Sequence, residues 1–164
     1  MSEQAPGAGI RRASWAGTAV FALSAVAATV APSTLKPAAL AIAGALFAGG
    51  CAVFLWAFVI VAGRSRTDRM ELAQIWFLTG PPTPRTVRRS LRGALAVQVV
   101  VGLATAGVRP YTSLAAGALV PMWGLALCGL WAARHATFPP RPADTRRPNT
   151  GLRSPNADRR EQDP

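Results

Sequence analysis

The fold is decided by residues 37–63, which read PAALAIAGALFAGGCAVFLWAFVIVAG and contain no charged side chain over 27 positions. The hydrocarbon core of a bilayer is about 30 Å thick, and a helix needs roughly 20 predominantly apolar residues to cross it. This stretch is long enough and apolar enough to do so. We therefore expect a transmembrane helix over about residues 38–63.

Three more uncharged stretches surround this one. They hold 23 residues between Arg12 and Lys36, 16 between Arg92 and Arg109, and 24 between Arg109 and Arg134. The stretch of 16 is short, but the arginine side chains at its ends can reach the headgroups and relieve the mismatch. The sequence thus predicts an all-α membrane protein with one domain of four transmembrane helices, residues 15–134. Its spans are expected at about residues 15–31, 38–63, 93–108 and 111–133.

The distribution of charge indicates how these helices are oriented. The 164 residues carry a formal net charge of +11, although only 15% are charged, against about 25% in a typical soluble domain. Cytoplasmic loops collect Lys and Arg. With both termini cytoplasmic, 16 of the 18 basic residues and all seven acidic residues lie inside, and only Lys36 and Arg109 lie outside. We therefore predict a multi-pass protein of the cell (inner) membrane, and we expect Trp15, Trp76 and Trp131 at its inner interface.

The first span also has features of a secretory signal peptide. Arg11 and Arg12 precede an apolar stretch in which residues 25–27 read AVA. The stretch is long for a signal, however, and cleavage after Ala31 would place Pro32 directly beyond the cut. Cleavage stays open as the alternative, and it leaves the orientation of the other three spans unchanged.

The two ends of the chain are predicted to be disordered cytoplasmic tails. Residues 1–14 are short and polar, and residues 135–164 are rich in Pro and Arg with almost no apolar side chain. The paired arginines of the second tail do not indicate nucleic-acid binding, because no aromatic residue follows Phe138 to stack on bases.

The inner loop, residues 64–92, carries signals for two helices. A hydroxyl and an acid near its start, and Gly80 followed by two prolines, predict an interfacial helix over about residues 67–79. Thr83-Pro84 then predicts the start of a second helix, which continues into the third span.

One face of that second helix carries four arginines at positions i, i+3, i+4 and i+7, namely Arg85, Arg88, Arg89 and Arg92. Positive flanks of this kind orient a membrane protein without any ligand. Alternatively, the stripe contacts anionic lipid or a cytosolic partner, since each juxtamembrane arginine contributes about 1 kcal/mol near a negative leaflet. The partners expected are membrane lipids with anionic headgroups on the inner face, and other membrane proteins or a second copy of the chain.

The spans themselves contain no Asp, Glu, Lys, Arg or His. Gln98 is the most polar side chain at depth, and we expect it to hydrogen-bond a neighbouring helix. Small residues let helix backbones approach closely in lipid, and they mark Gly102, Gly117 and Gly124 as packing positions. Pro121 frees the carbonyl of Gly117 and predicts a kink in the fourth span.

Two further segments have a recognisable pattern. One is ELAQIWFLTG, residues 71–80, followed by the Arg-rich lead into the third span; the other runs through the fourth span and ends in LWAARHATFPPR, residues 130–141. Both resemble small four-span membrane proteins of unknown function from high-GC actinobacteria. The resemblance covers residues 15–142 and implies an inner-membrane location, with no catalytic residues to transfer.

Few residues are available for chemistry. The chain has one His and two Cys, and no spacing predicts a metal site, a cofactor motif or a nucleophile with its base. We expect no catalytic, cofactor-binding or metal-binding residue. The function predicted is that of a non-catalytic integral inner-membrane protein with a structural, assembly or partner-binding role. A small oligomeric transporter or channel is the alternative, and an enzyme completed by a partner ranks third.

Overall fold

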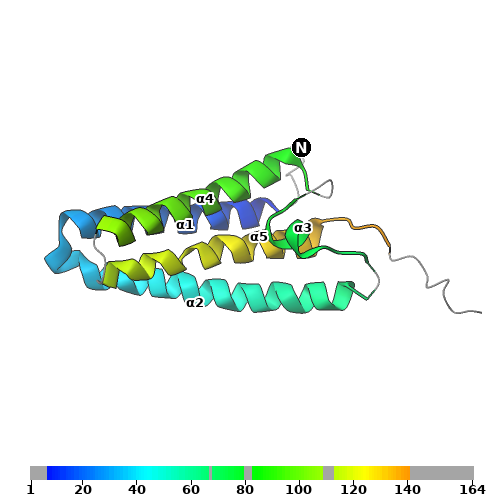
Figure 1. Ribbon diagram of the computed structural model, residues 1–164, viewed down its shortest axis with the longest axis horizontal. Helices are drawn as coiled ribbons and strands as arrows, with labels where there is room; N and C mark the ends of the chain where they lie inside the picture. The colour runs from blue at the N-terminus through cyan, green and yellow to red at the C-terminus, as the bar shows by residue number, and fades with distance from the viewer. Residues whose placement is uncertain (1–6, 67, 80–82, 109–112, 141–164) are drawn as a thin grey trace, which may run out of the picture.

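The computed structural model describes residues 7–66, 68–79, 83–108 and 113–140, which form a helical bundle (Figure 1). Its elements are α1 (Ala8–Val30), α2 (Pro32–Arg64), α3 (Leu72–Trp76), α4 (Arg85–Val108), the 3₁₀ helix η1 (Ser113–Leu119) and α5 (Pro121–His135). Four helical stretches are long and apolar enough to cross a membrane: Ala8–Val30, Ser33–Arg64, Arg85–Val108 and Ala116–His135. The all-α membrane fold expected from the sequence is confirmed.

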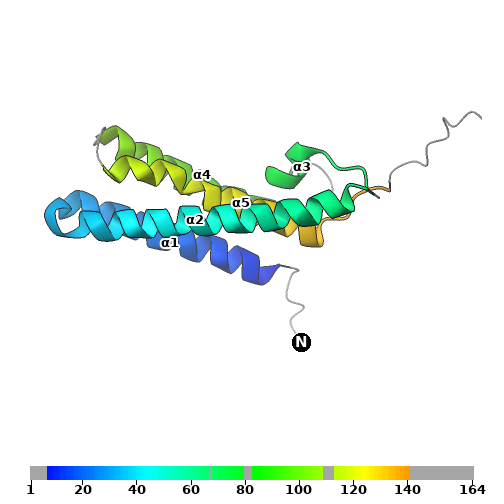
Figure 2. The same cartoon turned by 90° about the horizontal axis from the view of Figure 1, so that it is seen from below.

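The long helices run side by side and alternate in direction, so that α1 begins and α5 ends at the same end of the bundle (Figure 1). The last turn of α2, the short helix α3 and the first turn of α4 lie at this end as well (Figure 2). We call it the basic end, because it carries the arginines that the structure describes. These are Arg11, Arg12, Arg64, Arg66, Arg69, Arg85, Arg88, Arg89, Arg92 and Arg134.

The turn at the opposite end is tighter than the sequence suggested. Only Ala31 separates α1 from α2, and Pro32 occupies the first position of α2, where a helix needs no N–H donor. Pro37, expected to open the second span, lies inside α2 instead. With 33 residues, α2 is about 50 Å long, so it extends beyond a hydrocarbon core of about 30 Å.

Both predicted tails are partly ordered. Helix α1 begins at Ala8, directly after Gly7 in the left-handed conformation (φ 79°), so the expectation of disorder is wrong for residues 8–14. Helix α5 ends at His135, and the chain then runs extended along the inner loop, where the Arg69 N–H donates to the Pro139 carbonyl at 2.9 Å. Disorder is therefore also wrong for residues 135–140, whereas residues 1–6 and 141–164 lie outside the described residues.

The fourth span changes from a 3₁₀ helix to an α-helix at Pro121. The proline takes the first position of α5, and the seven residues of η1 before it are wound as a 3₁₀ helix. The Gly117 carbonyl, expected to be freed by Pro121, accepts the Val120 N–H at 3.1 Å. An i→i+3 bond of this kind is the tighter 3₁₀ pattern, so the proline changes the type of helix.

The inner loop packs into the bundle instead of lying only on its surface. Helix α3 has five residues, fewer than the expected 67–79, and it places Ile75 and Trp76 in a core built with α2, α4 and α5. Leu78 follows with φ 51°, a left-handed conformation that costs about 1–2 kcal/mol for a residue other than glycine. Its side chain is fully buried in the same core, which offsets that strain.

Trp76 is the centre of this contact. Its ring stacks on Phe54 of α2 with centroids 4.0 Å apart, and it lies so close to Gly129 of α5 that a Cβ there would overlap the indole. Trp76 and Trp131, predicted at the inner interface, are both buried in the protein, whereas Trp15 is 45% exposed.

Trp76→Ala is expected to destabilise the bundle, because it removes an 8%-exposed ring from the contact between α2, α3 and α5. Truncating a buried aromatic costs about 3–5 kcal/mol in protein cores, which predicts a clear fall in the thermal unfolding midpoint in lipid nanodiscs. Phe77→Ala is the matched control, since this neighbouring ring is 53% exposed. Equal effects of the two substitutions would contradict the packing described.

Candidate functional site

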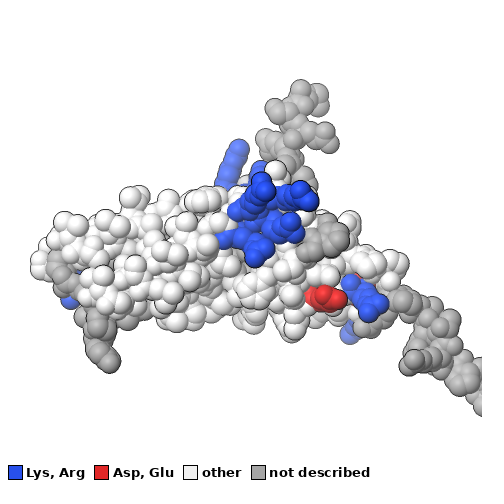
Figure 3. Space-filling view, turned by 45° about the horizontal axis from the view of Figure 1, so that its top comes forward, with Lys and Arg blue, Asp and Glu red and all other residues white. Residues whose placement is uncertain are grey.

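The arginine stripe of α4 lies on the outside of the basic end. Arg85, Arg89 and Arg92 are exposed and Arg88 is half-buried, while Val87 and Leu91 on the other side of the helix are buried in the core. In Figure 3 most of the basic side chains on the visible face gather in one patch, and a separate basic group lies beside the acidic side chain to its right. The spacing in sequence therefore becomes a continuous basic surface.

Helix α1 adds two arginines to this surface. A pocket of about 260 Å³ opens between the first turns of α1 and the start of α4, and Ala8, Arg11, Arg12, Trp15 and Ser90 line it. The Trp15 Nε1–H donates to the Ser90 Oγ at 3.1 Å and so ties the two helices together at the pocket. We call these five residues the basic cleft. From the sequence, Arg11 and Arg12 were expected in the N-terminal tail and as part of a signal-like pattern, and not at a site.

No acidic side chain lines the basic cleft. The acids among the described residues are Asp68 and Glu71, both in the inner loop. Asp68 accepts a hydrogen bond from the Arg64 Nη2 at 3.2 Å, and Glu71 accepts one from Gln74 at 3.2 Å. The Nε of Arg11 is buried and has no hydrogen-bond partner in the described part of the chain. The lining of the cleft, as far as the structure describes it, therefore carries positive charge and no acidic side chain.

Two turns further along α4, Gln98 joins three helices. Its side chain is completely buried; the Nε2–H donates to the Thr18 Oγ1 of α1 at 2.7 Å, and the Oε1 accepts the Gly124 N–H of α5 at 3.1 Å. The Thr18 hydroxyl in turn donates to the Ser14 carbonyl at 2.8 Å. Gly124 lies near the start of α5, where backbone N–H groups lack partners within the helix, so Gln98 acts as its cap.

The predicted packing glycines lie along the same seam between α4 and the fourth span. A Cβ on Gly124 would stand 2.7 Å from the Gln98 Oε1, and a Cβ on Gly102 would stand 2.8 Å from the Gly117 carbonyl oxygen. Both separations are closer than real Cβ contacts. Pro121 starts α5 between these two contacts. Four of the five residues expected at helix contacts, Gln98, Gly102, Gly117 and Gly124, thus lie at one interface.

Sequence analysis missed the role of Arg64, which it treated as an orientation charge. The Arg64 side chain extends from the end of α2 and donates to the carbonyls of Ala133 at 2.8 Å and Ala136 at 3.1 Å. Its guanidinium also pairs with Asp68 and lies 5.7 Å from the centroid of the Phe138 ring. These contacts cap the end of α5 and hold the segment that follows it; the i, i+4 pairing with Asp68 was the available sequence signal.

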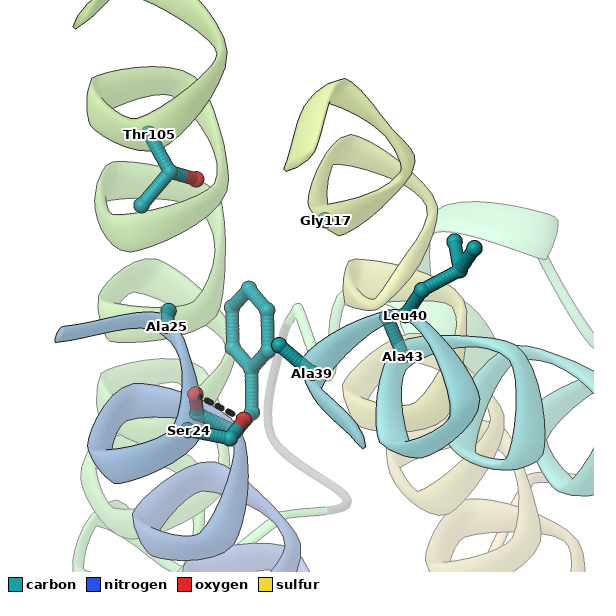
Figure 4. A pocket seen from close by; sticks show the side chains of 8 residues that line it. Ser24, Ala25, Ala39, Leu40, Ala43, Thr105 and Gly117 are labelled. Carbon is teal, nitrogen blue, oxygen red and sulfur yellow. Dashed lines mark hydrogen bonds between the residues drawn. The ribbon is translucent and has the colours of Figure 1, made fainter. Parts of the chain in front are cut away.

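A second pocket, in the opposite half of the bundle, lies between α1, α2, α4 and η1 (Figure 4). Its volume of about 10 Å³ holds at most one water molecule. The Ser24 hydroxyl donates to the Phe21 carbonyl at 2.9 Å, and the Thr105 hydroxyl donates to the Val101 carbonyl at 2.9 Å. The polar side chains at this pocket thus bond to their own helices, which is typical of a packing gap.

No protein-family model, curated protein or solved structure matches this chain. The resemblance to small four-span actinobacterial membrane proteins stays a prediction. What the basic cleft binds must be inferred from its own geometry and charge.

Gln98→Leu is expected to lower the free energy of unfolding, because it leaves the Thr18 hydroxyl and the Gly124 N–H without their partner. Hydrogen bonds between membrane helices contribute about 0.6 kcal/mol on average and up to about 1.7 kcal/mol. We expect a loss of about 1–2 kcal/mol, measured by equilibrium unfolding in mixed micelles.

A double-mutant cycle with Thr18→Val isolates this interaction. A coupling energy of about 0.5–1.5 kcal/mol is expected between the two substitutions. Val100→Leu serves as a control on the exposed face of the same helix. Additive effects of Gln98→Leu and Thr18→Val would show that the bond contributes nothing to stability.

Proposed function

We propose that this chain is a non-catalytic structural component of the inner membrane, which associates with lipids and with other membrane proteins. The observation that carries the proposal is that polar side chains in the interior of the bundle bond to the protein's own groups, with the buried Ser14 Oγ as an exception. Gln98 and Thr18 use their hydrogen bonds to join helices, and Thr105 bonds to its own helix. Binding or converting a substrate inside the bundle would require polar groups not already bonded in this way.

The outer surface supports the same proposal. Large apolar side chains on the long helices point away from the bundle, including Leu23 on α1, Phe58 on α2 and Leu103 on α4, all more than half exposed. In a membrane such faces contact acyl chains or the helices of other proteins. The basic end supplies the only concentrated charge among the described residues, apart from Lys36 at the opposite end.

The orientation proposed places the basic end in the cytoplasm. It is supported by the described arginines, which all lie at the end where α1 begins and α5 ends. Translocation of that many basic residues is disfavoured, so the opposite orientation is the costly one.

A reporter fusion tests this orientation. Green fluorescent protein fused after Pro164 is expected to fluoresce, because it folds in the cytoplasm, and alkaline phosphatase fused at the same place is expected to be inactive. Phosphatase fused after Lys36, at the opposite end, is the matched control and should be active. The reverse pattern would invert the topology.

Reconstitution tests the structural role against the alternative of an oligomeric transporter or channel. Liposomes that contain the purified chain are expected to release potassium ions and protons no faster than protein-free liposomes, with gramicidin as the positive control. In native membranes, a photoreactive residue at exposed Phe58 is expected to form a discrete protein adduct on irradiation, and none without irradiation. Protein-dependent, saturable flux without an adduct would overturn the structural role in favour of transport.

A further inference from the structure

The basic cleft has the chemistry of a phosphate site. Two arginines of α1 converge on a pocket whose far wall is Ser90 of α4. Guanidinium groups bind phosphate oxygens through paired N–H donors, and they keep their charge at any physiological pH. Because the Ser90 Oγ accepts the Trp15 indole N–H, its own hydroxyl hydrogen remains free to donate.

A hydrogen bond between two long helices spans the cleft, and one buried arginine nitrogen has no hydrogen-bond partner among the described residues. The Trp15–Ser90 hydrogen bond of 3.1 Å joins two long helices, so the pocket does not depend on a loop. The buried Nε of Arg11 has no acceptor among the described residues, and burying a donor without a partner costs about 1–3 kcal/mol. By contrast, the Arg64 guanidinium at the same end is already bonded to Asp68 and two carbonyls.

The surroundings of the cleft indicate that the phosphate belongs to a lipid. Trp15 lines the pocket and is 45% exposed, as expected of an indole at the boundary between headgroups and acyl chains. Beyond it, Val20 and Leu23 project from α1 into the apolar zone. Leu23 is 11 residues from Arg12, which is about 16 Å along a helix and close to the depth of one leaflet.

We propose that the basic cleft binds the phosphate of one anionic phospholipid, with Arg11 and Arg12 on the headgroup and the acyl chains along α1. The stripe from Arg85 to Arg92 lies on the same helix as Ser90 and at the same end of the bundle, where it raises the local concentration of anionic lipid. This inference rests on the proposed membrane orientation, and it replaces a general attraction to the leaflet with a defined site between two helices.

Native mass spectrometry of the purified full chain tests the site. In non-ionic detergent with added phosphatidylglycerol, we expect one molecule to be retained in preference to phosphatidylcholine. Arg11→Gln/Arg12→Gln is expected to weaken that binding about thirtyfold, roughly fivefold for each arginine. The matched control, Arg66→Gln/Arg134→Gln, removes two exposed charges from the same end outside the cleft and should change binding less than about fivefold, one arginine's share at most.

Three outcomes would overturn the proposal. Equal weakening by the control variant would show that the protein's net charge alone attracts the lipid. Equal retention of phosphatidylcholine, whose phosphate charge is balanced by choline, would show that the net negative charge of the headgroup is not selected. Displacement of phosphatidylglycerol by millimolar inorganic phosphate, with phosphate bound in its place, would assign the cleft to the free anion. If the double arginine variant fails to fold, Ser90→Ala takes its place as a smaller change within α4. It is also expected to weaken the binding of phosphatidylglycerol.

The inference fails separately from the proposed function. If the protein shows no selectivity for phosphatidylglycerol but leaves liposomes sealed, the proposed lipid site alone is contradicted. If the protein retains its lipid but conducts ions across the liposome membrane, the proposed structural role alone is contradicted.

Discussion

The structure depends on the rule that a polar group inside a membrane protein must find its partner within the protein. Gln98 shows how the bundle meets that rule. Its amide bonds to Thr18 of α1 and to the Gly124 N–H of α5. One side chain thus provides hydrogen-bond partners for polar groups on two other helices. The absence of a Cβ at Gly124 is what allows α5 to come close enough, because a methyl group there would meet the amide oxygen.

The basic end depends on a second set of contacts, made by the inner loop. Trp76 fills the space beside Gly129 and Phe54, and Arg64 bonds to the carbonyls at the end of α5. Between them they fix the end of α2, the end of α5 and the chain that follows it. The loop is therefore part of the core, which explains why its apolar residues form a cluster rather than a strict amphipathic stripe.

These contacts also determine where charge is left available. Arg64 is committed to backbone carbonyls and to Asp68, whereas the cleft between α1 and α4 has two arginines and no acid among its lining residues. The arginines that orient the protein thus have two different roles in the folded structure. One arginine acts as a helix cap, and a pair on α1 with Ser90 forms a site with anion-binding chemistry.

The sequence by itself determined the number of long helices, because a bilayer sets their length and uncharged stretches of that length are visible in any one-dimensional reading. It also identified the start of α4, the arginine stripe, and Gln98 with its neighbouring glycines as contact positions. Only the tertiary structure decided that Arg11 and Arg12 face Ser90, that Arg64 caps α5, and that Trp76 is buried. The contacts of Trp15 with Ser90, Arg64 with Ala133 and Trp76 with Gly129 join residues more than 50 positions apart, and local periodicity carries no information about which helices become neighbours. The change of helix type at Pro121 was also decided only in the folded structure. What a proline does to a helix depends on where the preceding carbonyls find their partners.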